Sequence, residues 1–120
     1  MYIVNAFSLQ MLQSDSAVFV RELKVQDVLH LSERFGLQSA IGHADTAAVV
    51  SGLLGLDLPA NRVNVQIGKK DRCVVAQLMG GRLPEGSTTL PENMQIKFFC
   101  VETWPIEEVD VIAMSTATEG

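Results

Sequence analysis

The segment QIKFFCVETW, residues 95–104, is apolar on both of its alternating faces. Such a strand is expected at the centre of a sheet, where neighbouring elements shield both faces from water. The rest of the chain therefore has to supply partner strands and covering helices. With 120 residues, the chain is long enough for one domain that buries roughly two thirds of its unfolded surface.

Several other segments predict strands that can pair with this one. The short segments rich in β-branched residues are 2–6, 17–23 and 72–79. Residues 62–67, RVNVQI, alternate most regularly, with valine and isoleucine on one face and polar side chains on the other. If residues 68–71 form a four-residue hairpin loop, Arg62 faces Gln77 across the ladder. This pairing depends on the loop length, because a shift of one residue reverses the face.

Two segments have helical periodicity. Residues 25–35 place apolar side chains at helical spacing, and Gly36 can adopt the left-handed conformation that ends a helix. A second helix is predicted over residues 44–54, with Gly55 as its terminator. We therefore expect an α+β fold, with a mixed, largely antiparallel sheet of about five strands and helices on one side.

The sequence also predicts the turns and loops between these elements. Residues 7–12 predict a turn or short helical piece, and residues 80–92 form a loop rich in glycine and proline. The second helix carries small residues at positions 48, 51, 52 and 55, which either pack flat on the sheet or admit a helix across a dimer. Residues 1–104 are predicted to form the domain, and residues 105–120 an acidic appendage.

Composition excludes several classes of protein. No apolar run approaches the ~20 residues that span a bilayer, and no secretory signal is visible, so we expect a soluble cytoplasmic protein. Cys73 and Cys100 lie in predicted strands, and no Cys/His spacing suits zinc. The net charge of −5 argues against broad binding of duplex nucleic acid. It still permits a small phosphate ligand held by a few arginines.

A set of polar residues comes from a strand end, a helix start, a hairpin and a glycine-rich loop. These residues are Asn5, Ser8, His43, Arg62, Gln77, Arg82 and Glu85. Guanidinium groups suit phosphate oxygens, and the helix N-terminus at His43 adds backbone N–H groups. The set predicts an anion site without a metal ion, because no carboxylate cluster that could hold Mg²⁺ is apparent.

Histidine and glutamate beside a bound phosphate allow proton transfer during phosphodiester cleavage. In RNA the 2′-hydroxyl can attack the neighbouring phosphorus, so the protein needs to supply geometry, charge stabilisation and a proton for the 5′-oxygen. His43 is the candidate donor. The positive end of a helix disfavours the charged imidazolium, whereas a phosphate ligand favours it. Activity is therefore expected to fall as the pH rises well above neutrality.

Each polar residue also has a structural interpretation. Asn5 and Ser8 are suited to capping a turn. Arg82 and Glu85 are spaced for a surface salt bridge, which contributes ~0 to 1 kcal/mol. The sequence leaves these alternatives open.

Four motifs in order, NAFS (5–8), SAIGHADTA (39–47), NRV (61–63) and RLPEG (82–86), resemble the viral ring nuclease family. The resemblance covers roughly residues 2–103. That family contains anti-CRISPR enzymes that degrade cyclic tetra-adenylate, the second messenger of type III CRISPR immunity. It implies a metal-independent phosphodiesterase without a cofactor, acting as a homodimer with the ring across its two-fold axis.

The resemblance implies a role for each matching residue. The implied catalytic residues are His43 and Glu85, and the implied ligand-binding residues are Asn5, Ser8, Asp45, Thr46, Arg62, Gln77 and Arg82. Asp45 departs from the family pattern, since relatives carry a small hydroxyl residue there. The paired glycines before Arg82 also change the length of that loop.

The sequence is also compatible with two other functions. The same residues would permit a protein that sequesters the cyclic nucleotide without cutting it. Alternatively, the chain is a small viral or mobile-element regulator that contacts DNA or a host protein through the small-residue helix face. A regulator of DNA needs a contiguous basic face, which the sequence does not supply.

Overall fold

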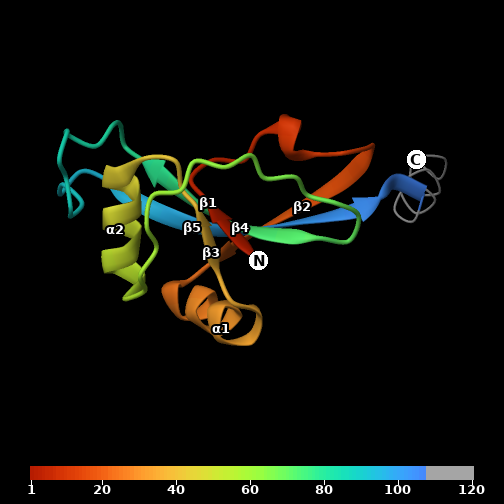
Figure 1. Ribbon diagram of the computed structural model, residues 1–120, viewed down its shortest axis with the longest axis horizontal. Coiled ribbons are helices and arrows are strands. Elements are labelled where there is room, and N and C mark those ends of the chain that lie inside the picture. The colour runs from red at the N-terminus through yellow and green to blue at the C-terminus, as the bar shows by residue number, and fades with distance from the viewer. Residues whose placement is uncertain (108–120) are drawn as a thin grey trace, which may run out of the picture.

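The computed structural model describes residues 1–107 as a sheet with helices packed against it (Figure 1). Its elements are β1 (Tyr2–Val4), the 3₁₀ helix η1 (Leu9–Met11), β2 (Ser16–Leu23), α1 (Val25–Phe35), β3 (Gln38–Ala40), α2 (Ala44–Leu54), β4 (Arg72–Met79) and β5 (Gln95–Pro105). The fold is α+β, as predicted. In the part of the chain that the structure describes, no helix is long and apolar enough to span a bilayer.

The five strands form one mixed sheet in the order β2-β5-β4-β1-β3. β5 pairs antiparallel with β2 and with β4 over eight residues each. β1 runs parallel to both β3 and β4, over three and two residue pairs. β5 thus lies between two strands, which confirms the interior position expected from its two apolar faces.

Both helices begin and end where local chemistry predicts. The Asp27 carboxylate accepts a hydrogen bond of 2.8 Å from the Lys24 N–H at the start of α1. Gly36 ends α1 with φ 74°, and Gly55 ends α2 with φ 66°. Positive φ suits glycine because it lacks a Cβ; Gly55 has the predicted left-handed helical conformation, whereas Gly36 combines its positive φ with an extended ψ of 140°.

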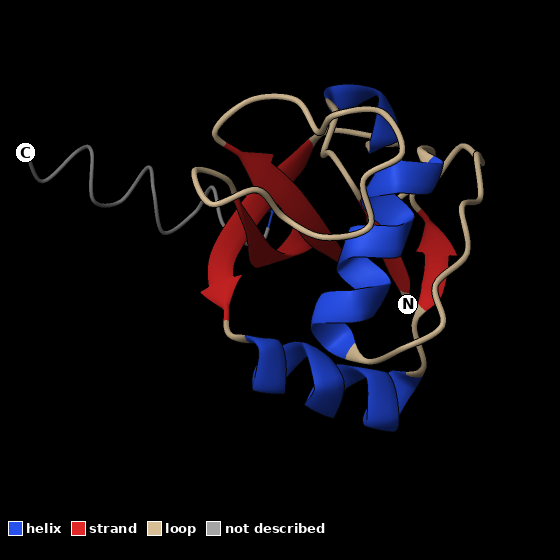
Figure 2. Ribbon diagram, turned by 90° about the vertical axis from the view of Figure 1, so that its left-hand side faces the viewer, coloured by secondary structure: helices blue, strands red, loops and turns tan. Residues whose placement is uncertain are grey.

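The helices cover one face of the sheet. Val28 of α1 and Val50 of α2 are both fully buried, and they share one cluster with sheet residues. The sheet members of this cluster are Ile3, Val74, Ala76 and Phe98. Figure 2 shows α1 running along one end of α2, so the helices form a single layer.

The opposite face of the sheet is covered without an α-helix. η1 and the segment before β4 lie across it, on the side opposite α1 (Figure 1). Met11 from η1, with Val65 and Ile67 from that segment, packs against the buried residues of this face. Their sheet partners are Val4, Ala40, Cys73, Val75 and Val101.

The prediction of a strand at residues 62–67 is wrong. Both edges of β4 are already occupied, by β1 and by β5, so no edge remains for a hairpin. The segment makes one isolated bridge, Ile67 with Leu12. Its alternation still has meaning, since Val65 and Ile67 are buried whereas Val63 is 45% exposed. The alternation reflects packing on the sheet face rather than membership of the sheet.

The predicted pairing of Arg62 with Gln77 is therefore also wrong. Gln77 pairs with Lys97 of β5 instead. The 68–71 turn is present, but it joins the covering segment to β4. The buried Thr103 hydroxyl ties this turn to β5, because it donates to the Gly68 carbonyl and accepts from the Asp71 N–H at 3.3 Å.

β3 is not predicted by the sequence pattern. This strand has only three residues, Gln-Ser-Ala, none of which is β-branched or aromatic. It forms because β1 offers a free edge, where residues 2–4 pair in parallel with residues 38–40. β5 ends at Pro105, one residue beyond the predicted domain boundary. The predicted acidic appendage lies mostly outside the described residues.

The two cysteines, Cys73 and Cys100, are both buried, and their side chains point to opposite faces of the sheet. Burial, with smaller contributions from Cys100 and Asp71, raises the pKa of Cys73 from 9.0 to about 12. Burial also raises the pKa of Cys100. The folded protein binds the Cys73 proton more tightly than the unfolded chain does. The contribution of this thiol to the free energy of unfolding is therefore fully present below pH 9 and decreases as the pH rises towards 12.

We predict slow thiol modification in the native state. At pH 8, a disulfide reagent such as DTNB should react with the folded protein roughly 100-fold or more slowly than with the urea-unfolded chain, because the thiolate is the reactive form. Absorbance of the released thiolate measures both rates. Equal rates would contradict the buried placement of the two cysteines.

Candidate functional site

The carboxyl ends of three strands meet at one edge of the sheet. β1, β3 and β4 run parallel, so the residues that follow them emerge on the same side. Asn5 follows β1, His43 follows β3 at the start of α2, and Arg82 follows β4 after two glycines. In open α/β sheets, ligands commonly bind outside the carboxyl ends of parallel strands. This edge is the candidate site.

A cavity of about 410 Å³ opens at the start of α2. We call it the histidine cavity; it is lined by Asn5, His43, Asp45, Thr46, Leu78, Arg82 and Leu83. His43 occupies the N-cap position of α2, but its side chain makes no capping hydrogen bond. The imidazole is exposed rather than packed into the core. It is therefore available to a ligand in the cavity.

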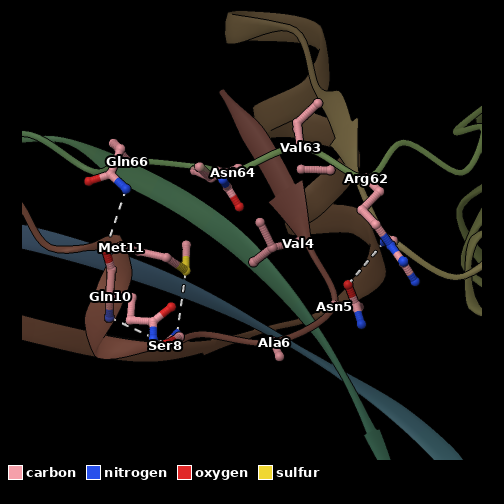
Figure 3. Close-up of a pocket in the computed structure, with 13 residues that line it drawn as sticks. Val4, Asn5, Ala6, Ser8, Gln10, Met11, Arg62, Val63, Asn64 and Gln66 are labelled. Atoms are coloured by element: carbon pink, nitrogen blue, oxygen red, sulfur yellow. Dashed lines mark hydrogen bonds between the residues drawn. The ribbon is translucent and has the colours of Figure 1, made fainter.

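A second cavity, of about 490 Å³, lies on the face covered by η1 (Figure 3). We call it the amide cavity because Asn5, Gln10, Asn64 and Gln66 all line it, together with Ser8 and Arg62. Asn5 and Arg62 lie at one end of it, and Gln10 and Gln66 at the other (Figure 3). Carboxamides both donate and accept hydrogen bonds, so this wall suits a polar, uncharged group.

Asn5 lines both cavities. Its Oδ1 accepts a hydrogen bond of 3.3 Å from the Gly42 N–H, which links the end of β1 to the loop before His43. Asn5 therefore has a structural role and also contributes to both cavity walls. This hydrogen bond joins two distant segments rather than capping a local turn, and ligand binding by Asn5 stays a prediction.

Arg62 reaches the site although it is not in a strand. Asn61 fixes the local chain, because its Nδ2 donates to the Ser39 carbonyl at 2.8 Å and its N–H donates to the Ile41 carbonyl at 2.8 Å. The Arg62 side chain then lies beside Gly42, where a Cβ would come within 3.8 Å of Nε. Asn61 was missed as a site residue; its place in the NRV motif was the available signal.

Asp45 and Thr46 lie in the first turn of α2 and line the histidine cavity. Thr46 is 9% exposed. One carboxylate oxygen of Asp45 accepts a hydrogen bond of 3.1 Å from the Gly86 N–H, which belongs to the loop after β4. This contact brings the RLPEG segment to the start of α2.

Ser8 lines the amide cavity and also caps η1, where its hydroxyl accepts from the Gln10 N–H at 3.3 Å. The predicted turn cap is thus present. The alternative salt bridge between Arg82 and Glu85 is not among the ion pairs of residues 1–107. The ion pair found there, Lys97–Glu22 at 3.7 Å, joins β5 to β2. Arg82 is instead an exposed member of the histidine cavity.

Two predicted site residues line neither cavity. Gln77 is half-buried in β4, and its side-chain amide donates to the Leu78 carbonyl at 3.1 Å. Glu85 is exposed on the loop, next to the Gly86 that binds Asp45. The structure therefore gathers seven of the nine predicted residues around Asn5, and leaves these two at its margin.

Within residues 1–107, no group of three or more His, Cys, Asp or Glu side chains is placed to hold a metal ion. The histidine cavity contains the His43 imidazole, the Asp45 carboxylate and the Arg82 guanidinium, and Arg62 adds a second guanidinium in the adjoining amide cavity. The N-terminus of α2 contributes a partial positive charge. This arrangement can bind an anion and place an imidazole beside it.

The fold and the site define a small α+β protein with polar cavities at the carboxyl edge of three parallel strands. The chain belongs to the STIV B116-like family, whose model matches residues 1–100. It is similar to B116 of Sulfolobus turreted icosahedral virus, with 28% identity and a TM-score of 0.69, over 87% of this chain and 97% of that one. Uncharacterized protein 26 of Sulfolobus islandicus filamentous virus (isolate Iceland/Hveragerdi) is 26% identical over 101 residues, covering 82% of this chain and 85% of that protein.

We predict that Asn5→Ala destabilises the protein by about 0.5–1.5 kcal/mol, the usual contribution of one hydrogen bond. The change removes the acceptor of the Gly42 N–H. Urea unfolding followed by circular dichroism measures the difference. Asn64→Ala is the matched control, since Asn64 is exposed and has no hydrogen bond among the described residues. Equal effects of the two substitutions would contradict this role of Asn5.

Proposed function

We propose that this protein is a ring nuclease, a metal-independent phosphodiesterase that cuts cyclic tetra-adenylate into linear di-adenylate ending in a 2′,3′-cyclic phosphate. The observation that carries the proposal is the histidine cavity, where the exposed His43 lies at the start of α2 in the same cavity as Arg82. The four motifs that resemble the ring nuclease family supply the residues of this site. The similarity to two viral proteins fits an anti-CRISPR role that ends type III signalling.

The site can bind phosphate although the protein is acidic. The chain carries a net charge of −5, but two guanidinium groups and a helix N-terminus converge near Asn5. Fixed local donors of this kind attract an anion at short range, where they outweigh distant surface charges screened by salt. A small cyclic nucleotide fits such a site better than a duplex, which needs an extended basic face.

The proposed reaction needs one proton at one atom. The ribose 2′-oxygen attacks the adjacent phosphorus and forms a new P–O bond, while the bond from phosphorus to the 5′-oxygen breaks. The protonated imidazole of His43 gives its proton to the departing 5′-oxygen, and the 2′-hydroxyl proton passes to solvent. Arg82 and the N–H groups of α2 stabilise the charge on the phosphoryl oxygens.

Other residues have supporting roles in the proposal. Arg62 holds a neighbouring phosphate at the junction of the two cavities, and Asn5, Ser8 and Thr46 offer hydrogen bonds along the walls. Glu85 assists orientation or proton transfer when the loop that carries it approaches the ligand. Gln77 belongs to the ligand-binding set through the resemblance, from its position in β4 near the loop.

We propose a homodimer as the active form. A ring of four identical nucleotides has a two-fold axis, so an isologous dimer can present the same site to opposite phosphates. The small residues of α2, at positions 48, 51, 52 and 55, offer a surface on which the helix of a second protomer can approach closely. The space beside Gly52 is open, because an added Cβ there meets no atom within 4 Å. Two symmetric cuts then release two di-adenylates.

Replacing His43 by alanine should slow cleavage by roughly 10²- to 10⁴-fold while leaving binding largely intact, the usual range for loss of a general acid. Chromatography of products from cyclic oligoadenylates of several ring sizes, with and without a chelator, measures the rate. His30→Ala is the matched control, because His30 is exposed on α1. Cleavage by the His43 variant at the parental rate would refute the assignment.

Arg62→Ala should instead weaken binding of cyclic tetra-adenylate. Loss of one charge-assisted phosphate contact predicts a Kd that is higher by about 10- to 100-fold. Isothermal titration with the His43→Ala protein as background measures binding without turnover. Arg34→Ala, an exposed arginine on α1, serves as the control. An unchanged Kd would remove Arg62 from the site.

The same experiments separate ring nuclease activity from sequestration. A protein that only sequesters the messenger binds it tightly in titration, yet yields no linear product in chromatography. A regulator of DNA or of a host protein gives neither signal. The nuclease proposal requires both.

A further inference from the structure

We propose that Asp45 is a positioning residue. Its hydrogen bond to the Gly86 N–H, called the clasp below, holds the loop of residues 80–94 against the start of α2 and thereby places Arg82 in the histidine cavity. The catalytic consequence of the clasp rests on the proposed function. The clasp itself does not, because it follows from the contacts of this loop.

The base of the loop is held by close backbone packing. Gly80 has φ 100°, and a Cβ at this position would lie 2.7 Å from the Asn93 carbonyl oxygen. Only glycine permits such an approach, so the two ends of the loop stay together next to β4 and β5. The loop is thus anchored at its base, and its tip needs a separate contact.

The tip of the loop is a tight turn that presents one N–H group outward. The Ser87 N–H donates to the Pro84 carbonyl at 3.1 Å, and Gly86, in the third position of the turn, has φ 80°. A positive φ at that position is typical of a type II turn. The Gly86 N–H takes no part in closing the turn, and it is free to bind another element.

That element is α2. The Gly86 N–H donates to the Asp45 Oδ2 at 3.1 Å, across 41 residues of sequence. Among the hydrogen bonds described for residues 1–107, this is the one that joins the loop of residues 80–94 to another element. The loop is otherwise mostly exposed, including Arg82 and Glu85. The hydrogen bond from Gly86 to Asp45 is therefore the polar contact that ties the tip to α2.

The clasp connects α2, which is packed on the core, to the loop that carries Arg82. α2 is rigidly seated, because Ala47, Val50 and Leu54 are buried in the core beneath it. Arg82 and Leu83 line the same cavity as Asp45 and His43. Without the clasp, the loop would lose its contact with α2, and Arg82 would spend less time in the cavity.

Asp45 has a second possible effect, which the test has to separate. A carboxylate in the first turn of a helix also stabilises that helix through the dipole. Asp45→Asn retains a side-chain oxygen that can accept the Gly86 N–H but removes the charge. Asp45→Ala removes both. The clasp predicts that asparagine rescues what alanine loses.

Limited trypsin digestion of the full chain tests the clasp directly, because Arg82 precedes Leu83 and forms a cleavable bond in the loop. Intact mass spectrometry follows cleavage after Arg82, with cleavage in the 68–71 turn as an internal reference. Asp45→Ala should speed cleavage after Arg82 by about 5- to 10-fold, as expected when one hydrogen bond that closes a segment is lost. Asp45→Asn should stay within about twofold of the parent protein.

The control is Asp57→Ala, which removes an exposed aspartate just after α2 that has no hydrogen bond among the described residues. It should leave cleavage after Arg82 unchanged. Hydrogen exchange on the unmodified protein gives a second measurement that needs no variant, since the Gly86 amide should be protected relative to the Gly81 amide. Equal cleavage of the parent and Asp45→Ala proteins, or an unprotected Gly86 amide, would overturn the clasp.

The catalytic consequence has its own readout. With cyclic tetra-adenylate, Asp45→Ala should lower kcat/KM by about tenfold, mainly through KM, and Asp45→Asn should restore most of it. If the parent protein gives no linear product, the proposed function fails, while the digestion result still decides the clasp. If the parent cuts the ring and Asp45→Ala cuts it equally well, the positioning role is wrong.

Discussion

The parallel pairing of β1 with both β3 and β4 is the constraint on which the rest of the molecule depends. β1 has only three residues, yet it lies between its two partners and runs in the same direction as each. Asn5, His43 and Arg82 follow the three strands, so this pairing brings residues 77 positions apart in the chain to one edge. The hydrogen bond from Gly42 to Asn5 then joins two of the strand ends directly.

The sheet is covered by two different means, and this difference creates two cavities. Two helices shield one face, and an irregular segment with η1 shields the other. Because Asn5 emerges at the edge between these faces, it borders the histidine cavity on the helical side and the amide cavity on the other. The carboxamides and Arg62 line one of these cavities, whereas His43, Asp45 and Arg82 line the other.

Charge at the site is a matter of local placement rather than composition. The protein is acidic overall, but the start of α2 and two arginines converge near Asn5. Asp45 adds a negative group there, and its hydrogen bond to Gly86 directs that group towards the loop. The half-buried Asp45 carboxylate thus accepts a backbone N–H of the loop.

The sequence by itself determined the helices and the strands β1, β2, β4 and β5, because caps, glycine terminators and apolar patterning act over a few neighbouring residues. Of the nine predicted site residues, seven line the two cavities. Motif spacing identified His43 and Arg82, which the tertiary structure brings into one cavity. Only the tertiary structure decided that β3 forms and that residues 62–67 stay outside the sheet. Both outcomes depend on which strand edges are already occupied. A local sequence pattern does not determine this, because the pairing partners lie far away in the sequence.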